Sequence, residues 1–217
     1  ACAPFRRLHL CDHNLETIET TSTTTTSDTL LLEVCMAAKF EAESLINYRA
    51  QYDATYPDSP SQICTMLARS FADIGDIVRG RDLYFGKRKK KNQKETETER
   101  DQLENKLKEI FEKIYSEVTR GRNGQDLKTR YNGDTKDYYK LREDWWEANR
   151  ETVWKAMTCE APEGASYFRK TCSDEQGGAE ANHQCRCPKS RNNKPNDQVP
   201  TYFDYVPQYL RWFEEWA

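Results

Sequence analysis

An aromatic segment between Asp137 and Cys159 constrains the fold more than any other part of the chain. It reads DYYKLREDWWEANRETVWKAMTC and holds three of the protein's five tryptophans. Residues that recur at steps of three and four lie on one face of an α-helix. Each aromatic side chain can bury about 150–250 Å², so such a face needs a large partner surface. We therefore expect a core helix, with an aromatic ligand box as the alternative. Its core residues are Trp145, Trp146, Val153, Trp154 and Met157.

The overall composition limits what the surface can do. Hydrophobic residues make up 36% of the 217 residues and charged residues 32%, with a mean hydropathy of -0.99. The net charge of -3 is too small to indicate nucleic-acid or membrane binding by the whole molecule. No apolar run approaches the ~20 residues that cross a bilayer. We expect any membrane anchor to lie outside this sequence.

Eight cysteines indicate disulfides formed in an oxidising compartment. A zinc site built from Cys172, Cys185 and Cys187, with Cys159 or His183, is disfavoured because structural zinc sites use cysteine pairs spaced by two to four residues. A single residue separates Cys185 from Cys187, so we expect each to pair with a different partner. The cysteines are Cys2, Cys11, Cys35, Cys64, Cys159, Cys172, Cys185 and Cys187.

The remaining periodicity is helical. We expect one helix from an N-cap at Asp28 to just before Pro57, and a second from Ser61 to Gly80, antiparallel to the first because the link is short. A third carries a leucine and isoleucine stripe and ends at Gly121 and Gly124. The aromatic helix is expected to open near Asp134, and a final helix follows Pro207. The expected apolar positions of the first helix are Leu31, Cys35, Ala38, Ala42, Leu45 and Tyr52. Those of the third helix are Leu103, Leu107, Ile110, Ile114 and Val118. Those of the last helix are Val206, Leu210, Phe213 and Trp216.

No segment shows convincing strand alternation. The predicted fold class is therefore all-α, a helical bundle with long disulfide-tied loops.

One concentrated basic run could carry a charge-based function. It comprises Lys87, Arg88, Lys89, Lys90 and Lys91, with Arg79 and Arg81 upstream. Several cations together can neutralise the sulfates of anionic glycans by releasing counterions; a solvated loop is the plainer interpretation. A looser second set is Arg186, Lys189, Arg191 and Lys194. No aromatic residues interleave with these charges, so we do not expect nucleic acid as a partner.

Nothing in the sequence predicts an enzyme or a cofactor. The histidines are His9, His13 and His183, and no cysteine stands in a recognisable nucleophile setting. The glycines at 121 and 124 follow a helix rather than a strand, so they form no phosphate-binding loop.

Several long motifs resemble a known family. They are ARSFADIGDIVRGRDLY (residues 68–84), DWWEANRETVWKAMTC (144–159) and PQYLRWFEEWA (207–217), together with CAPFRRLHLC (2–11) and LLLEVCMAAKFEAESL (30–45). The first three closely resemble the Duffy-binding-like domain, and the last two its alpha class in erythrocyte membrane protein 1 of Plasmodium falciparum. The resemblance spans nearly the whole chain and is interrupted at residues 86–100 and 173–199, where the family is expected to vary.

The resemblance implies a helical adhesive domain on the surface of the infected host erythrocyte. Its implied partners are host cell-surface receptors, sulfated or blood-group glycans, including heparan sulfate, and antibodies, with rosetting and antigenic variation as the setting. A structural or immune-decoy module without receptor contact is the alternative.

The resemblance also implies subdomains. Residues 1–60 would form part of the first and residues 61–217 the second, with the third absent. By analogy Cys64 pairs with Cys185 or Cys187, and Cys2 and Cys11 have partners upstream of residue 1.

Overall fold

The protein is described here by a computed structural model. It describes residues 2–19, 25–56, 63–86, 88–91, 95–121, 124–134, 136–162, 165, 167, 172, 181, 184–187 and 198–217, with the backbone alone for 88–91 and 95–97. The helices and strands are α1 (Phe5–Leu8), a 3-10 helix η1 (His13–Thr17), α2 (Thr26–Thr55), α3 (Ile63–Arg79), β1 (Arg88–Lys91), β2 (Glu95–Thr98), α4 (Glu99–Arg120), α5 (Gly124–Arg130), α6 (Tyr139–Thr158), a second 3-10 helix η2 (Phe203–Tyr205) and α7 (Gln208–Trp216). The predicted, mostly helical fold class is confirmed.

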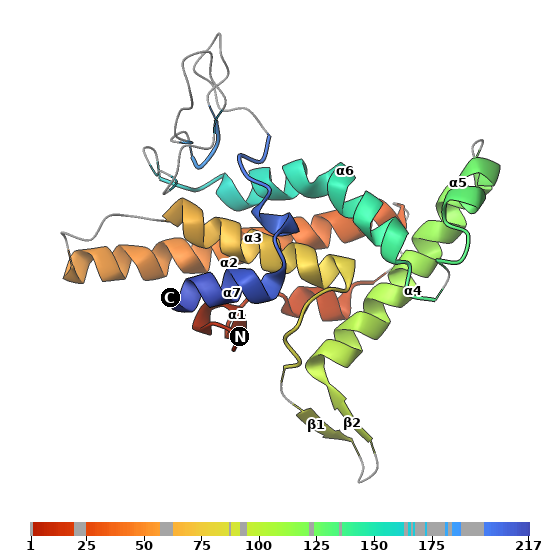
Figure 1. Ribbon diagram of the computed structural model, residues 1–217, viewed down its shortest axis with the longest axis horizontal. Helices are drawn as coiled ribbons and strands as arrows, with labels where there is room; N and C mark the ends of the chain where they lie inside the picture. Colours follow the sequence, from red (N-terminus) through yellow and green to blue (C-terminus); the bar gives the residue numbers. More distant parts are fainter. Residues whose placement is uncertain are drawn as a thin grey trace.

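Three long helices form the body of the molecule. Helices α2, α3 and α6 lie side by side, with α3 antiparallel to α2 as expected, and α4 crosses their end (Figure 1). Helix α3 contacts α2, α6 and α7 and is buried along almost its whole length. The core therefore sits where α2, α3 and α6 meet.

Helix α2 begins slightly earlier than predicted. Its cap is Thr25, whose hydroxyl accepts a hydrogen bond from the backbone N–H of Asp28, so Asp28 is not the N-cap. Ala38, Ala42 and Leu45 of the expected stripe are buried. The buried face also includes Leu30, Val34 and Ala37, whereas Tyr52 is exposed. Apolar residues occur all around this helix, so periodicity alone could not select the buried face.

The aromatic helix α6 begins at Tyr139, five residues after the predicted start. Tyr138 has a left-handed backbone (φ 56°), which ends the preceding turn and prevents the helix from starting earlier. Asp134 still serves the helix, since its carboxylate accepts a hydrogen bond of 3.1 Å from the N–H of Leu141.

Helix α4 follows the predicted stripe and ends before Gly121, as expected. Its start is a capping box, in which Thr98 and Asp101 exchange backbone and side-chain hydrogen bonds. Gly124, in contrast, does not end this helix, because it opens the short helix α5.

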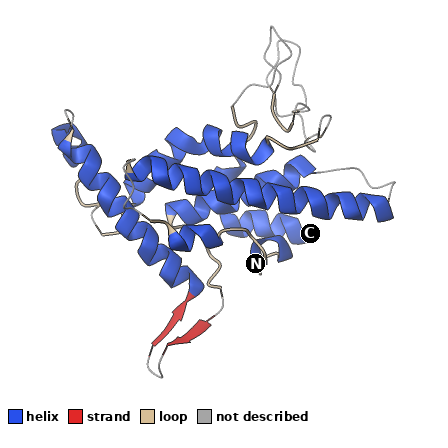
Figure 2. Ribbon diagram, turned by 180° about the vertical axis from the view of Figure 1, so that it is seen from behind, coloured by secondary structure: helices blue, strands red, loops and turns tan. Residues whose placement is uncertain are grey.

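The expectation of an exposed loop without strands at residues 86–100 is wrong. Strands β1 and β2 form an antiparallel hairpin there, which leads into α4 and projects beyond the helices (Figure 2). Lysine and glutamate are weak strand formers, which hid the signal.

The final helix buries the opposite face from the one predicted. Gln208, Arg211 and Trp212 point inward, while Leu210, Phe213 and Trp216 are exposed along with Val206. The reason is electrostatic. Arg211 donates hydrogen bonds of 2.7 Å to Asp73 and 2.6 Å to Asp76 on α3, and these buried carboxylates require cationic partners.

The predicted boundary between residues 60 and 61 falls between α2 and α3. One hydrophobic core includes residues from both sides of it. The division into two subdomains stays a prediction.

Candidate functional site

The basic run lies mainly on the projecting hairpin. Residues 88–91 form β1, and Lys87 is outside the described residues. The ladder pairs Arg88 with Thr98, Lys89 with Glu97, Lys90 with Thr96 and Lys91 with Glu95. Since the hairpin stands away from the bundle (Figure 1), it places this run within reach of a partner.

Arg79 does not belong to this surface, which corrects its assignment as a candidate ligand-binding residue. It is only 1% exposed. Its guanidinium donates to the backbone oxygens of Gly75 (3.0 Å) and Asp204 (2.5 Å) and to the carboxylate of Asp76 (2.8 Å). Arg79 lies on the helix face that turns into the core, where these acceptors compensate the loss of water.

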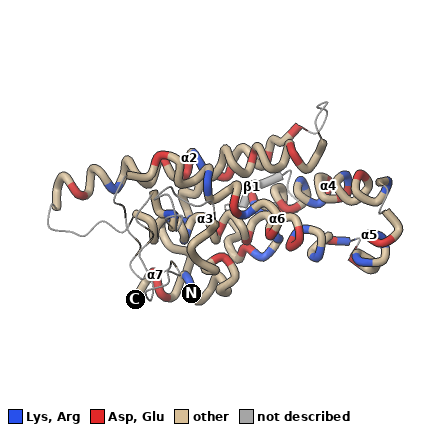
Figure 3. Tube along the Cα trace, turned by 90° about the horizontal axis from the view of Figure 1, so that it is seen from above, with Lys and Arg blue, Asp and Glu red and all other residues tan. Residues whose placement is uncertain are grey.

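Arg81, two residues later, is a surface residue. Its side chain is 58% exposed and lies 2.9 Å from the carboxylate of Glu143. Elsewhere Lys and Arg are mixed with Asp and Glu along α4 and α6 (Figure 3). Among the described residues, the helices therefore offer no long stripe of one sign that would compete with the hairpin for an anionic partner.

Of the second basic set, the structure describes Arg186 alone. Arg186 is buried and donates a hydrogen bond of 3.1 Å to the side-chain oxygen of Gln184. Lys189, Arg191 and Lys194 lie outside the described residues. Arg186 follows Cys185, whose buried disulfide draws this short segment inward.

The aromatic segment is core, so the ligand-box alternative is wrong. Trp145, Trp146, Val153, Trp154 and Met157 are all buried. The ring of Phe71 on α3 lies 5.1 Å from the rings of both Trp146 and Trp154. Two tryptophans also hydrogen-bond across the fold, Trp145 to Ser27 and Trp146 to Asp204, each at 2.9 Å. These rings hold the scaffold and leave no open box.

One disulfide ties the segment after α6 to the bundle, and a second joins two residues within that segment. Cys64 at the start of α3 pairs with Cys185, and Cys172 pairs with Cys187. The expected separate partners for Cys185 and Cys187, and the pairing of Cys64 with one of them, are confirmed. The alternative of a zinc site is wrong, because the thiols of Cys172, Cys185 and Cys187 form these disulfides.

The other four cysteines are free in this chain, which corrects the assignment of Cys35 and Cys159 as disulfide-bonded; the expected upstream partners of Cys2 and Cys11 stay a prediction. They are Cys2, Cys11, Cys35 and Cys159. Cys35 lies within α2, and Cys159 is the C-cap of α6. Burial raises the pKa of the Cys35 thiol to about 11, which keeps it protonated and unreactive at neutral pH.

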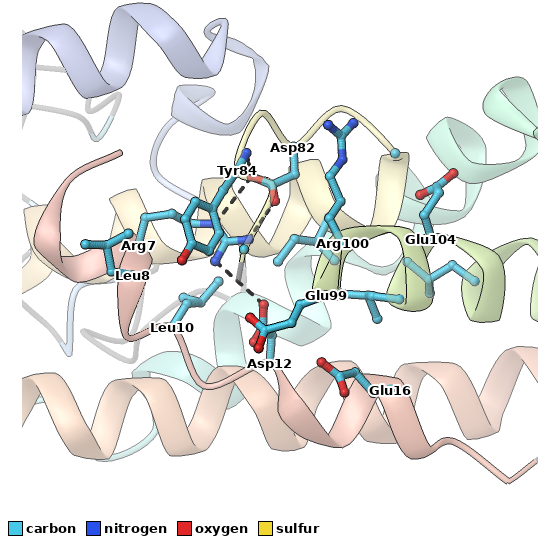
Figure 4. A pocket seen from close by; sticks show the side chains of 15 residues that line it. Arg7, Leu8, Leu10, Asp12, Glu16, Asp82, Tyr84, Glu99, Arg100 and Glu104 are labelled. Atoms are coloured by element: carbon cyan, nitrogen blue, oxygen red, sulfur yellow. Dashed lines mark hydrogen bonds and ion pairs between the residues drawn. The ribbon is translucent and has the colours of Figure 1, made fainter. Parts of the chain in front are cut away.

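A polar hollow of about 170 Å³ lies between the N-terminal segment, residues 80–86 and the start of α4 (Figure 4). Arg7 crosses it, with a hydrogen bond of 2.6 Å to Asp82 and an ion pair of 3.7 Å to Asp12. Its guanidinium also lies 4.8 Å from the centre of the Tyr84 ring. These contacts hold the N-terminal segment against residues 82–84, which follow α3, and they occupy the guanidinium of Arg7.

The part of the chain that the structure describes lacks two further features. None of its helices has both the length and the apolar character to cross a membrane. No group of three or more His, Cys, Asp or Glu residues there is arranged to hold a metal ion.

Comparison with known proteins identifies the family. The family model of the Duffy binding domain matches residues 1–211. The chain belongs to the Duffy binding domain family. No curated protein matches the chain.

Solved Duffy binding domains share the fold. The NTS-DBL1(alpha-1) domain of Plasmodium falciparum membrane protein 1 (PfEMP1), from the varO strain, is 42% identical with a TM-score of 0.70, and the match covers 100% of this chain and 43% of that one. A PfEMP1 DBLbeta domain bound to ICAM-1 is 32% identical with a TM-score of 0.64, covering 100% and 44%. A DBLb domain of PfEMP1 bound to human ICAM-1 is 30% identical with a TM-score of 0.60, covering 97% and 38%.

The resemblance to PfEMP1 Duffy-binding-like domains is thus confirmed, with higher identity to the alpha-class structure than to the two beta-class ones. The chain spans less than half the length of these solved chains.

Proposed function

We propose that this chain is part of a cell-adhesion domain that binds host cell-surface receptors from the surface of the infected erythrocyte. The observation that carries this proposal is its membership of a family in which two solved PfEMP1 relatives are bound to ICAM-1. No catalytic role is proposed. Which receptor this chain binds is left to experiment.

The architecture supports an adhesive role because scaffold and contact surface are separate. Buried tryptophans, buried ion pairs and the Cys64–Cys185 disulfide hold the body of the domain. Residues 86–100, where the family is expected to vary, contribute a hairpin outside that body. Changes in such a segment have little effect on the core, which suits antigenic variation under antibody pressure.

A narrower proposal concerns sulfated glycans such as heparan sulfate. The hairpin carries Arg88 through Lys91, and Arg81 and Lys87 precede it in the chain. A cluster of cations of this kind binds polyanions through counterion release, with an affinity that falls as salt rises. Arg79 is withdrawn from the set because it is buried. Binding of blood-group glycans and rosetting remain proposals of the same kind.

The test uses the purified, disulfide-bonded chain of 217 residues. We expect it to bind host red cells or immobilised receptor protein, and to bind less after reduction of its disulfides. A correctly folded chain that binds no member of a panel of red cells, endothelial cells and immobilised heparin would overturn the adhesive role for this segment. If intact protein lacking the segment still adhered fully, the structural or decoy role would be favoured instead.

A further inference from the structure

A hollow of about 230 Å³ lies between the segment that follows α3 and the segment that joins η2 to α7. Arg81 and Leu83 line it from the first segment, and residues 204–209 line it from the second. Both η2 and α7 contact α3, so its two sides are held in place relative to each other. We call this hollow the η2–α7 cleft. It is separate from the polar hollow that Arg7 crosses, because the two share no lining residue.

The walls of the η2–α7 cleft are apolar and aromatic. The apolar residues of the lining are all exposed, and they are Leu83, Tyr205, Val206, Pro207 and Tyr209. Single exposed apolar residues are ordinary on a protein surface, whereas several around one hollow are typical of a binding site. Tyrosine is also among the residues that contribute most to protein–protein binding. The cleft therefore has the surface of a contact site.

The two carboxylates of the lining already have cationic partners. Asp76 accepts hydrogen bonds of 2.8 Å from Arg79 and 2.6 Å from Arg211. Asp204 accepts two hydrogen bonds from Arg150, at 2.9 and 2.7 Å. Because both carboxylates are buried in these pairs, neither is available to neutralise a cation that a ligand would bring.

Two further polar side chains of the lining are occupied as well. The guanidinium of Arg81 lies 2.9 Å from the carboxylate of Glu143, which neutralises its charge. The side chain of Gln208 accepts a hydrogen bond of 2.6 Å from the N–H of Leu83 and donates one of 2.8 Å to Asp82. The charged and amide groups of the lining are therefore paired within the protein, and what remains for a ligand is mainly apolar area.

We infer that the η2–α7 cleft receives a neutral apolar side chain, a phenylalanine or a leucine, from a protein receptor. This inference rests on the proposed receptor-binding role and names a surface that performs it. A cavity of about 150 Å³ accepts a benzene ring, so the size of the cleft suits one such side chain. A charged group would lose its water without gaining a free counter-ion. A sugar would bring hydroxyl groups to a lining whose polar partners are occupied.

A peptide titration tests the chemistry of the cleft directly. The probe is a soluble peptide that holds one phenylalanine among glycines and serines, and two matched peptides carry lysine or aspartate in its place. In the isotopically labelled chain, the amide signals of Leu83, Val206 and Tyr209 should shift with the phenylalanine peptide, with a dissociation constant of about 1 mM. The charged peptides and a blood-group trisaccharide should leave these signals unchanged. Equal shifts with a charged peptide or with the sugar, or no shift with any probe, would overturn the inference.

Matched variants locate the contact. Tyr209→Ala should weaken peptide binding about tenfold because it removes one wall of the cleft. Tyr48→Ala is the control, since Tyr48 is an exposed tyrosine of α2 outside the lining, and it should leave the affinity unchanged. Leu83→Asp, which places a charge in the cleft, should also abolish binding. Circular dichroism confirms that each variant is folded.

Cell binding and footprinting then separate this inference from the proposal beneath it. If the chain binds host cells and Tyr209→Ala binds them as well as wild type does, the adhesive role stands and the cleft is rejected as the receptor contact. If the peptide binds but no host cell does, the adhesive role fails, and the receptor fails with it as the source of the side chain. Hydroxyl-radical footprinting of the intact protein should modify Tyr209. Protection of Tyr209 without a partner would show that another part of the same protein fills the cleft, which would also overturn the inference.

Discussion

Arg150 on α6 and Asp204 on η2 form a two-point ion pair inside the protein, with N–O distances of 2.9 and 2.7 Å. Their side chains are 7% and 0% exposed. Asp204 also accepts a hydrogen bond from the indole N–H of Trp146. One carboxylate therefore fixes the aromatic helix to the segment that precedes α7.

Replacing this carboxylate should destabilise the whole domain. Asp204→Asn leaves the buried Arg150 without a counter-ion, and we expect the free energy of unfolding to fall by about 3 kcal/mol. Urea unfolding followed by tryptophan fluorescence measures it. Asp144→Asn is the matched control, because the Arg130–Asp144 pair is exposed and its loss should cost less than about 1 kcal/mol. Equal losses in the two variants would contradict the structure.

Gly75 on α3 permits the close approach of Trp146. A Cβ atom at this position would lie 2.7 Å and 2.8 Å from two atoms of the indole ring, and that ring is fully buried. Gly75→Ala should therefore destabilise the protein by about 1–3 kcal/mol, despite the better helix propensity of alanine. Gly121→Ala is the control, since a Cβ there meets nothing closer than 3.6 Å. Thermal unfolding of both variants should show a lower midpoint for Gly75→Ala alone.

The two disulfides should differ in their contributions. The Cys64–Cys185 bond joins residues 121 apart, and Cys172–Cys187 joins residues 15 apart. In the chain-entropy account a longer loop gives more stabilisation, by about 1–2 kcal/mol over this range. Cys64→Ala with Cys185→Ala should thus lower the denaturation midpoint in urea more than Cys172→Ala with Cys187→Ala. The reverse order would argue against Cys64–Cys185 as the main tie.

Asp12 should make stability depend on pH in the acidic range. Burial raises the pKa of this carboxyl to about 6, against the partial opposing effect of Arg7, whereas an unfolded aspartate titrates near ~3.9. The folded state thus binds the proton more tightly. Its contribution to stability is full below about pH 4 and is lost as pH rises through about 6.

The variant Asp12→Asn isolates this effect. Thermal midpoints of wild type and variant are compared at pH 7.5 and pH 5.0. Lowering the pH should shift the difference in favour of wild type, because only wild type gains a proton on folding. A difference that stays constant, or that moves toward the variant, would show that Asp12 titrates normally in the folded protein.

The hydrophobic pattern of the sequence predicted where the helices lie. It did not predict which face of the last helix, α7, is buried. Helices α4 and α6 bury the leucines, isoleucines and tryptophans that their periodicity indicated. Helix α7 does not, because Arg211 enters the interior to meet Asp73 while Phe213 remains exposed. Burial by itself would raise the pKa of Asp73. Arg6 and Arg211 lower it by more, so the pKa lies below its ordinary value. Such a pairing joins residues over a hundred positions apart, which no local pattern reveals.

For the candidate site too, the sequence determined some features and the tertiary structure determined others. The sequence by itself determined that a cationic cluster exists at residues 87–91 and that a tryptophan-rich helix must be covered. Only the tertiary structure decided that Arg79 lies inside and that residues 88–91 form a strand paired with residues 95–98. The physical reason is that hydrophobic periodicity acts over a few residues and is visible in the chain. Burial and neutralisation of a charge depend on the partners that folding brings to it.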